Sequence, residues 1–195
     1  MMSEPKEEEH IDVHAVFVGD GSVGKTSLLA VLKGLPFPRE YVPTTYDNYI
    51  KKVENPNGET KDIKFYDTAG QQDYYELRQF VYSGAHSPHA KTIFCIAFAL
   101  NNAITLGNIE EVWLPELSHQ IYDNEKILLG LKSDLREALN PEHISTEKAQ
   151  KFCQDHNIKY YIECSSKTGN GVDQVFQKMI EISNIPTKKK ICYLL

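Results

Sequence analysis

The stretch Gly19-Asp20-Gly21-Ser22-Val23-Gly24-Lys25-Thr26 contains a glycine, four further residues and then Gly-Lys-Thr. This spacing is typical of a loop that surrounds phosphate groups. Glycines let backbone N–H groups approach phosphate oxygens, while the lysine supplies a cation and the threonine a hydroxyl for Mg²⁺. The alternative is a plain tight turn, which leaves Gly-Lys-Thr at this offset unexplained. The stretch therefore predicts a site for a phosphate-bearing ligand.

The residues on either side of this loop predict a strand before it and a helix after it. Residues 13–18 are apolar apart from His14, and residues 26–35 place leucines and valine at helical spacing. Further along, residues 49–53 and 63–66 flank the turn-rich Asn55-Pro56-Asn57-Gly58, which predicts a hairpin.

Strands and helices are predicted to alternate through the rest of the chain. Continuous apolar runs at 92–100 and 127–131 are typical of central parallel strands. The other expected elements are a helix over 109–121, a helix capped by Ser145 and running to His156, a strand over 160–164, and a helix whose apolar face comprises Val172, Val175, Phe176, Met179 and Ile182. This alternation predicts an α/β fold, a three-layer α/β/α sandwich.

Polar clusters follow four of the expected strands. The glycine loop follows the first, and residues 67–71, 131–134 and 165–167 follow the third, fifth and sixth. Ligands of such sheets bind at the carboxyl ends of the strands, where these loops converge. We therefore expect all four clusters at one rim.

Composition excludes several classes of protein. The 195 residues, 41% of them hydrophobic, suit one domain with a single core. A net charge of -6 without a long basic stripe argues against a nucleic-acid partner. Four cysteines are scattered without a C-x-x-C pair, and residues 1–11 are acidic without an apolar run, so we expect a reduced, intracellular protein.

Two further features have alternative interpretations. His86 and His89 sit in a polar stretch with no nearby cysteine or carboxylate set, so we interpret them as solvated histidines rather than as metal ligands. Trp113 is interpreted as a core anchor, with a ligand contact as the alternative.

With five motifs in the family's order over residues 11–195, the chain resembles the Ras superfamily of small GTPases. The segments Tyr41-Val42-Pro43-Thr44 and Gln71-Gln72-Asp73-Tyr74 are most similar to its Rho branch. The resemblance implies the P-loop NTPase (small G-protein) fold, a mostly parallel six-stranded sheet with one antiparallel edge strand. It also implies GTP and GDP as ligands with Mg²⁺ as cofactor.

The resemblance assigns roles around the phosphates. Lys25 would bridge the β- and γ-phosphates, and Mg²⁺ would be held by Thr26, Thr44 and, through water, Asp67. Gly70 would offer its N–H to the γ-phosphate. The remaining residues expected at the phosphates and ribose are Gly19, Gly21, Ser22, Val23, Gly24, Ser27 and Tyr41.

The base is predicted to be guanine. Asp134 can accept hydrogen bonds from N1 and N2 of guanine, a pairing that adenine lacks, and Lys132 can lay its stem over the ring. Phe37 matches an aromatic that packs on the base, with a solvent-facing residue as the alternative. Ser165 and Lys167 resemble the motif that closes the pocket, where the N–H of Ser166 would meet O6.

Catalysis is expected from Gln71, Lys25 and Gly21. Gln71 is similar to the glutamine that orients the attacking water, and a side chain at Gly21 would crowd the space that Gln71 and an incoming arginine need. The sequence offers no motif for an internal arginine. We therefore expect slow intrinsic hydrolysis that an activating protein (GAP) accelerates by about 10³ to 10⁵.

The chain departs from the family in three places. Leu131 stands where the family has Asn or Thr, and a leucine cannot tie the base to the glycine loop, so we expect fast nucleotide release. The stretch 78–92 is longer than in typical Rho members, and 135–145 is too short for the branch's insert helix. The other interpretation of both lengths is neutral loop variation.

The C-terminus predicts a membrane anchor. Cys192-Tyr193-Leu194-Leu195 matches a prenylation box whose terminal leucine favours geranylgeranyl, and Lys188–Lys190 precede it. One lipid chain and a few lysines together give a reversible membrane address. The alternative is a flexible tail with an unmodified cysteine.

The sequence therefore predicts three parts: an acidic, flexible N-terminus (1–10), a G domain (11–185) and a polybasic hypervariable tail (186–195). The predicted function is a GTP-hydrolysing switch on the cytoplasmic face of the plasma membrane with a cytosolic pool, controlling actin and cell shape by analogy. Exchange factor, GAP, a GDI-like carrier and effectors would bind through residues 37–49 and 67–82. One alternative is a slowly or non-hydrolysing scaffold that binds nucleotide. A second alternative is an ATP-using kinase, against which the pair Lys132 and Asp134 argues.

Overall fold

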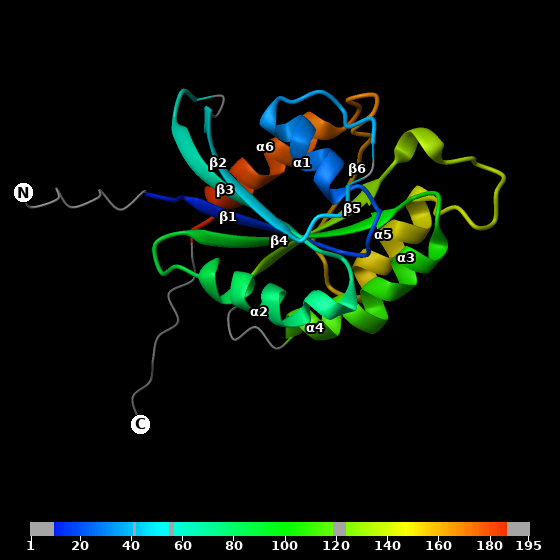
Figure 1. Ribbon diagram of the computed structural model, residues 1–195. Helices are drawn as coiled ribbons and strands as arrows, with labels where there is room; N and C mark the ends of the chain where they lie inside the picture. Colours follow the sequence, from blue (N-terminus) through cyan, green and yellow to red (C-terminus); the bar gives the residue numbers. More distant parts are fainter. Residues whose placement is uncertain (1–9, 41, 55–56, 119–123, 187–195) are drawn as a thin grey trace, which may run out of the picture.

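The computed structural model describes residues 10–40, 42–54, 57–118 and 124–186 (Figure 1). Its centre is a six-stranded sheet with the order β2-β3-β1-β4-β5-β6. The strands are β1 (Val13–Val18), β2 (Tyr46–Glu54), β3 (Thr60–Thr68), β4 (Lys91–Ala99), β5 (Glu125–Leu131) and β6 (Tyr160–Glu163). β2 pairs antiparallel with β3 at one edge, and all other pairs are parallel. The predicted sheet is confirmed.

Burial explains which strands are central. All six residues of β1 are buried, and β4 is buried from Thr92 onward, as expected for parallel strands covered on both faces. β2 is exposed or half-buried along its whole length because it has a neighbour on one side only.

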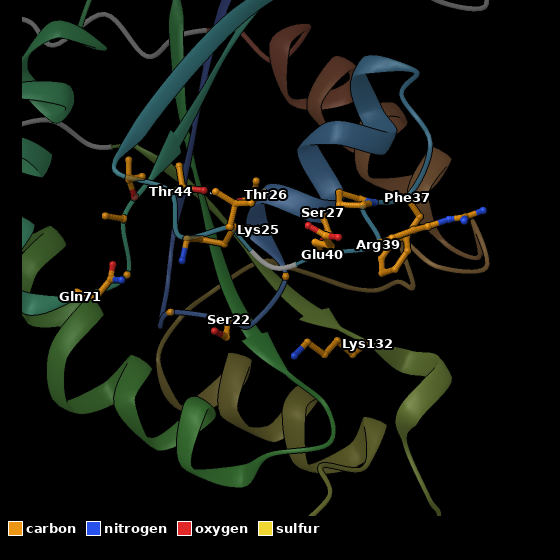
Figure 2. Close-up of a pocket in the computed structure, with 17 residues that line it drawn as sticks. Ser22, Lys25, Thr26, Ser27, Phe37, Arg39, Glu40, Thr44, Gln71 and Lys132 are labelled. Atoms are coloured by element: carbon orange, nitrogen blue, oxygen red, sulfur yellow. Dashed lines mark hydrogen bonds between the residues drawn. The ribbon is translucent and has the colours of Figure 1, made fainter.

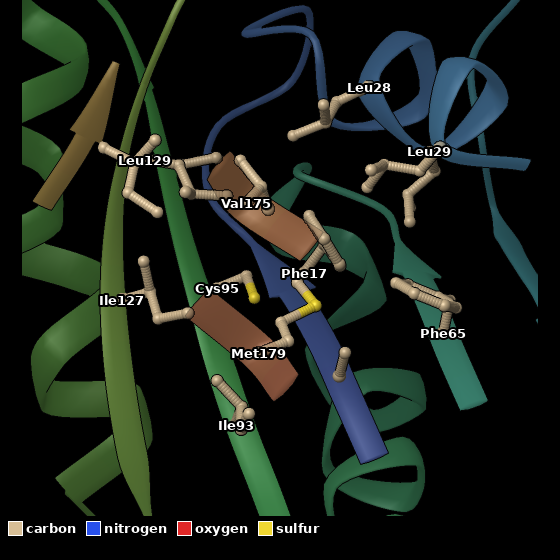
Figure 3. Packing of buried hydrophobic residues seen from close by; sticks show 14 of the residues in the cluster. Phe17, Leu28, Leu29, Phe65, Ile93, Cys95, Ile127, Leu129, Val175 and Met179 are labelled. Carbon is tan, nitrogen blue, oxygen red and sulfur yellow. The ribbon is translucent and has the colours of Figure 1, made fainter. Parts of the chain in front are cut away.

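Helices cover both faces of the sheet and confirm the three-layer sandwich (Figure 1). On one face lie α1 (Lys25–Lys33) and α6 (Val172–Ser183), whose Leu28, Leu29, Val175 and Met179 pack on alternate residues of β1, β4 and β5 (Figure 3). On the other face lie α2 (Tyr75–Gly84), α3 (Ala103–Asn108), α4 (Leu114–Ser118) and α5 (Thr146–Asp155). Short 3-10 turns are η1 (Gln72–Tyr74) and η3 (Ser133–Leu135).

Two predicted helices have different bounds in the structure. The first ends at Lys33 rather than at residue 35, because Gly34 adopts a left-handed conformation (φ 93°) that terminates it. The helix expected over 109–121 begins earlier, at Ala103, where the Asn102 side chain accepts a hydrogen bond from the N–H of Ile104. Its middle is a π-helical turn, η2 (Ile109–Trp113).

The helix cap at Ser145 is confirmed, since its hydroxyl accepts a hydrogen bond from the N–H of Lys148. Across the described ranges, no helix has both the length and the apolar character needed to cross a membrane. Residues 1–9 of the predicted N-terminus and residues 187–195 of the tail lie outside the described residues. The latter include the prenylation box at Cys192 and Lys188–Lys190.

Candidate functional site

The loops after β1, β3 and β5 surround a cavity of about 530 Å³ at one rim of the sheet. Figure 2 shows Gln71 and Thr44 on one side of this cavity, which we call the phosphate end, and Phe37 and Lys132 on the other. The cavity is lined by Gly21, Ser22, Gly24, Lys25, Thr26, Ser27, Phe37, Pro38, Arg39, Glu40, Val42, Thr44, Thr68, Ala69, Gly70, Gln71 and Lys132. Segments that are distant in the sequence therefore meet as predicted.

Lys25 lies at the start of α1 and is almost fully buried. Its ammonium donates hydrogen bonds to the carbonyl oxygens of Gly19 at 2.6 Å and Asp20 at 2.8 Å. Burial lowers the pKa of Lys25 to about 8, although the nearby carboxylates of Asp67 and Asp20 act in the opposite direction. A phosphate in the cavity would restore the stability of the charged form.

Three oxygen-bearing side chains at the phosphate end fit a Mg²⁺ ion. The hydroxyl oxygens of Thr26 and Thr44 lie 2.6 Å apart. Asp67 is buried, and its Oδ1 has no hydrogen-bond partner among the described residues. Burial raises the pKa of Asp67, against the lowering effect of the Thr26 and Thr44 hydroxyls and of Lys25. Hard oxygen donors around an unsatisfied buried carboxylate are the set that Mg²⁺ prefers.

Gly70 brings the segment after β3 into direct contact with the glycine loop. A Cβ atom on Gly70 would lie 2.2 Å from the nitrogen of Gly21 and 2.3 Å from the carbonyl carbon of Asp20. A side chain at Gly70 is therefore excluded without movement of one loop. A Cβ on Gly21, in contrast, meets no atom within 4 Å and would occupy the cavity side of the loop.

A second cavity of about 260 Å³ adjoins the first, and we call it the base pocket. It is lined by Gly24, Ser27, Phe37, Leu131, Lys132, Asp134, Leu135, Ser166 and Lys167. Ser165 Oγ donates a hydrogen bond to Asp134 Oδ1 at 2.6 Å and accepts one from the N–H of Thr168. The loops after β5 and β6 are thus tied together, and the Asp134 carboxylate is oriented before any ligand binds.

Leu131 is buried and forms part of the wall of the base pocket. A Cβ placed on Gly24 would lie 3.7 Å from its Cδ1 atom, so an apolar side chain fills the space between the base pocket and the glycine loop. The leucine that departs from the family's Asn or Thr at position 131 is thus accommodated by apolar packing.

The structure places most predicted site residues at these two cavities of the described chain. Gly19, Val23, Asp67 and Ser165 do not line either cavity, because they are buried behind neighbouring atoms. Phe37 lines both cavities and is 40% exposed, a position that suits packing on a base. Tyr41 and Cys192 lie outside the described residues.

Several residues at the site were missed by the sequence prediction. Arg39, Glu40 and Val42 line the larger cavity, next to the predicted Phe37. A buried ion pair joins Arg78 to Glu116 beneath the segment that bears Gln71. Arg39, Glu40 and Val42 fall inside the predicted partner-binding segment 37–49 but were not singled out. Arg78 and Glu116 are 38 residues apart in the sequence, so no local pattern marked their pairing.

Comparisons with known proteins agree with this geometry. The family model described as Ras family matches residues 14–184. GTP-binding protein RHO1 of Candida albicans is 37% identical over 193 residues, which cover 92% of this chain and 94% of the relative. GTP-binding protein rho1 of Schizosaccharomyces pombe is 35% identical over 185 residues, covering 90% and 88%.

GTP-binding protein RHO4 of Saccharomyces cerevisiae is 34% identical over 166 residues, covering 85% of this chain and 55% of the relative, so the chain spans about half of that protein. The matches to the other two relatives extend over most of this chain and over most of each relative. Because the family model covers most of the chain and relatives more than 30% identical are matched over most of their length, the chain belongs to the Ras superfamily of small GTPases and is Rho-like within it.

Proposed function

We propose that the protein is a Mg²⁺-dependent GTP switch in which the γ-phosphate holds residues 37–49 and 67–82 in an ordered, partner-binding state. The observation that supports it best is the convergence of Thr26 Oγ1 and Thr44 Oγ1, 2.6 Å apart, near the buried Asp67, whose Oδ1 has no hydrogen-bond partner in the part of the chain that the structure describes. Thr44 belongs to the first of these segments, while Thr26 belongs to the glycine loop. A Mg²⁺ ion held by both hydroxyls would tie the first segment to the nucleotide.

When bound, Mg²⁺ would neutralise negative charge on the phosphate oxygens. Lys25 would exchange its carbonyl partners for phosphate oxygens, and the Gly70 N–H would meet the γ-phosphate. Gln71 lines the same end of the cavity and would orient the attacking water. The charge of an arginine would come from a GAP, so intrinsic turnover is slow. Hydrolysis removes the γ-phosphate and releases both segments.

Amide hydrogen exchange on the Mg²⁺-loaded protein tests this switch. Bound to a non-hydrolysable GTP analogue, residues 37–49 and 67–82 should exchange more slowly than in the GDP form. The α5 helix, none of whose residues lines either cavity, serves as an internal reference. Equal protection of both segments in the two forms would contradict the proposal and favour a nucleotide-bound scaffold. Competition between GTP and ATP tests guanine selectivity, since only guanine presents N1 and N2 donors to Asp134.

We also propose that the protein works at the cytoplasmic face of the plasma membrane, with a cytosolic pool bound to a GDI-like carrier. The support is the C-terminal Cys192 box with Lys188–Lys190. Mass spectrometry of the native C-terminus should find a geranylgeranyl thioether, and a Cys192→Ser variant should stay in the cytosolic fraction. An unmodified Cys192 in the native protein would refute the anchor.

Control of actin and cell shape, through exchange factors, GAPs and effectors, is proposed from membership of the Rho-like branch. Cells expressing a Gln71→Leu variant should change their actin filaments and outline, because the GTP form would persist. The matched control is the same variant combined with Cys192→Ser. Unchanged actin with Gln71→Leu at normal expression would contradict the assignment.

A further inference from the structure

Trp113 is the single tryptophan of the chain, and its side chain is almost fully buried. Its Nε1 donates a hydrogen bond of 2.7 Å to Asp20 Oδ1 in the glycine loop. The guanidinium carbon of Arg78 lies 4.9 Å from the centre of its ring. One side chain thus contacts the glycine loop with its edge and a residue of α2 with its face.

Arg78 continues this link to the segment that bears Gln71. Its Nη1 donates hydrogen bonds to the carbonyl oxygens of Gln71 at 2.7 Å and of Ala69 at 3.1 Å, on both sides of Gly70. Glu116 accepts from Arg78 through both carboxylate oxygens at 2.8 Å, and Tyr82 donates to the same carboxylate. The guanidinium is therefore fixed from several sides and cannot take another position without breaking buried hydrogen bonds.

The π-helical turn over Ile109–Trp113 explains how two side chains reach the same carboxylate. Asn108 Nδ2 donates to Asp20 Oδ2 at 2.7 Å, while Trp113 donates to Oδ1. In an α-helix, residues five apart point about 140° away from each other. A π-turn brings them close to one face, and such turns are frequent at functional sites.

We propose that Trp113 is a positioning residue for GTP hydrolysis, which sets the place of the Gln71 segment relative to the glycine loop. Gly70 packs directly on Gly21 and Asp20, so the two loops need matched positions within a fraction of an ångström. Gln71 acts only if its side chain meets the attacking water at the γ-phosphate, and small misplacements are costly in rate. Trp113 contacts both Asp20 and Arg78, and it lines neither cavity.

The test is single-turnover GTP hydrolysis by a Trp113→Phe variant, which keeps a six-membered aromatic ring but lacks the indole N–H. Loss of one hydrogen bond predicts hydrolysis about two- to tenfold slower. GDP affinity should change by less than about twofold, because the base pocket contacts are untouched. Thr92→Val is the matched control: it removes a buried hydrogen bond of 2.7 Å to Ala85 at the opposite end of β4. Its hydrolysis rate should equal that of the native protein.

A double-mutant cycle with Asp20→Ala separates positioning from loss of packing. If Trp113 acts through Asp20, adding Trp113→Phe to Asp20→Ala should slow hydrolysis no further. Thermal unfolding of each variant ensures that the measured protein is folded. A native rate in Trp113→Phe, an equal loss in Thr92→Val, or multiplicative effects in the cycle would each overturn the proposal. This inference rests on the proposed hydrolytic function. The rate of the unmodified protein in the same assay tests that function separately from the role of Trp113.

Discussion

Leu131→Asn is expected to slow GDP release, because it restores the amide that this position lacks. Leu131 is 2% exposed, and its Cδ1 lies within 3.7 Å of the Cβ position of Gly24. An asparagine there can reach the backbone of the glycine loop. One such buried hydrogen bond contributes about 0.5 to 1.5 kcal/mol, equivalent to release about two- to tenfold slower.

The same substitution removes apolar packing and should lower the free energy of unfolding by about 2 kcal/mol or more. That loss is present with and without nucleotide, so it does not enter the ratio of bound to free protein. The two effects can therefore be measured independently. A lower melting temperature together with slower release is the expected combination.

The assay is displacement of a fluorescent GDP derivative by excess GDP at fixed Mg²⁺. Leu131→Met is the matched control, since it conserves volume without adding a hydrogen-bonding group. Its release rate should equal that of the native protein. Equal rates in the native and Leu131→Asn proteins, or an equal slowing by Leu131→Met, would refute the reasoning.

Three further predictions concern the glycine loop and one buried histidine. The pKa of Lys25 is about 8 in the free site, and a bound phosphate would raise it, so nucleotide binding takes up a proton above pH 8. GDP affinity measured by calorimetry should therefore fall about fourfold from pH 7 to pH 8.5. A constant affinity over this range would contradict the prediction. Gly21→Val should slow single-turnover hydrolysis at least about tenfold by crowding Gln71. Its melting temperature should stay close to that of the native protein, because a Cβ at position 21 meets no atom within 4 Å. A large fall in melting temperature would show that the space beside Gly21 is not free. Burial, together with Lys64 and His86, lowers the pKa of His14 to about 4, so the unfolded chain takes up a proton below pH 6.5 that the folded chain does not. Native stability in urea should therefore drop by about 1 to 2 kcal/mol between pH 7 and pH 5, and a His14→Gln variant should lose less; identical slopes would exclude His14 as the cause.

The order of elements was predictable because it depends on short-range patterns. Alternating and continuous apolar runs predicted the strands, and their correct assignment placed Asp67, Leu131 and Ser165 near one rim. The glycine loop was predictable because its backbone conformation requires particular residues at fixed offsets. Errors arose at helix ends, where Gly34 and Asn102 determine the bounds through local hydrogen bonds.

The sequence by itself determined the fold class and the position of the phosphate loop, and it predicted the residues proposed to read a guanine base, since each depends on spacing within one segment. Only the tertiary structure decided that Trp113 contacts Asp20 and that Arg78 holds the carbonyl of Gln71. Those contacts join segments up to 93 residues apart, and the sequence pattern of a buried arginine or tryptophan is the same whatever its partner. Packing of α2, α3 and α4 against the sheet brings these groups together, and this depends on long-range geometry that no local periodicity records.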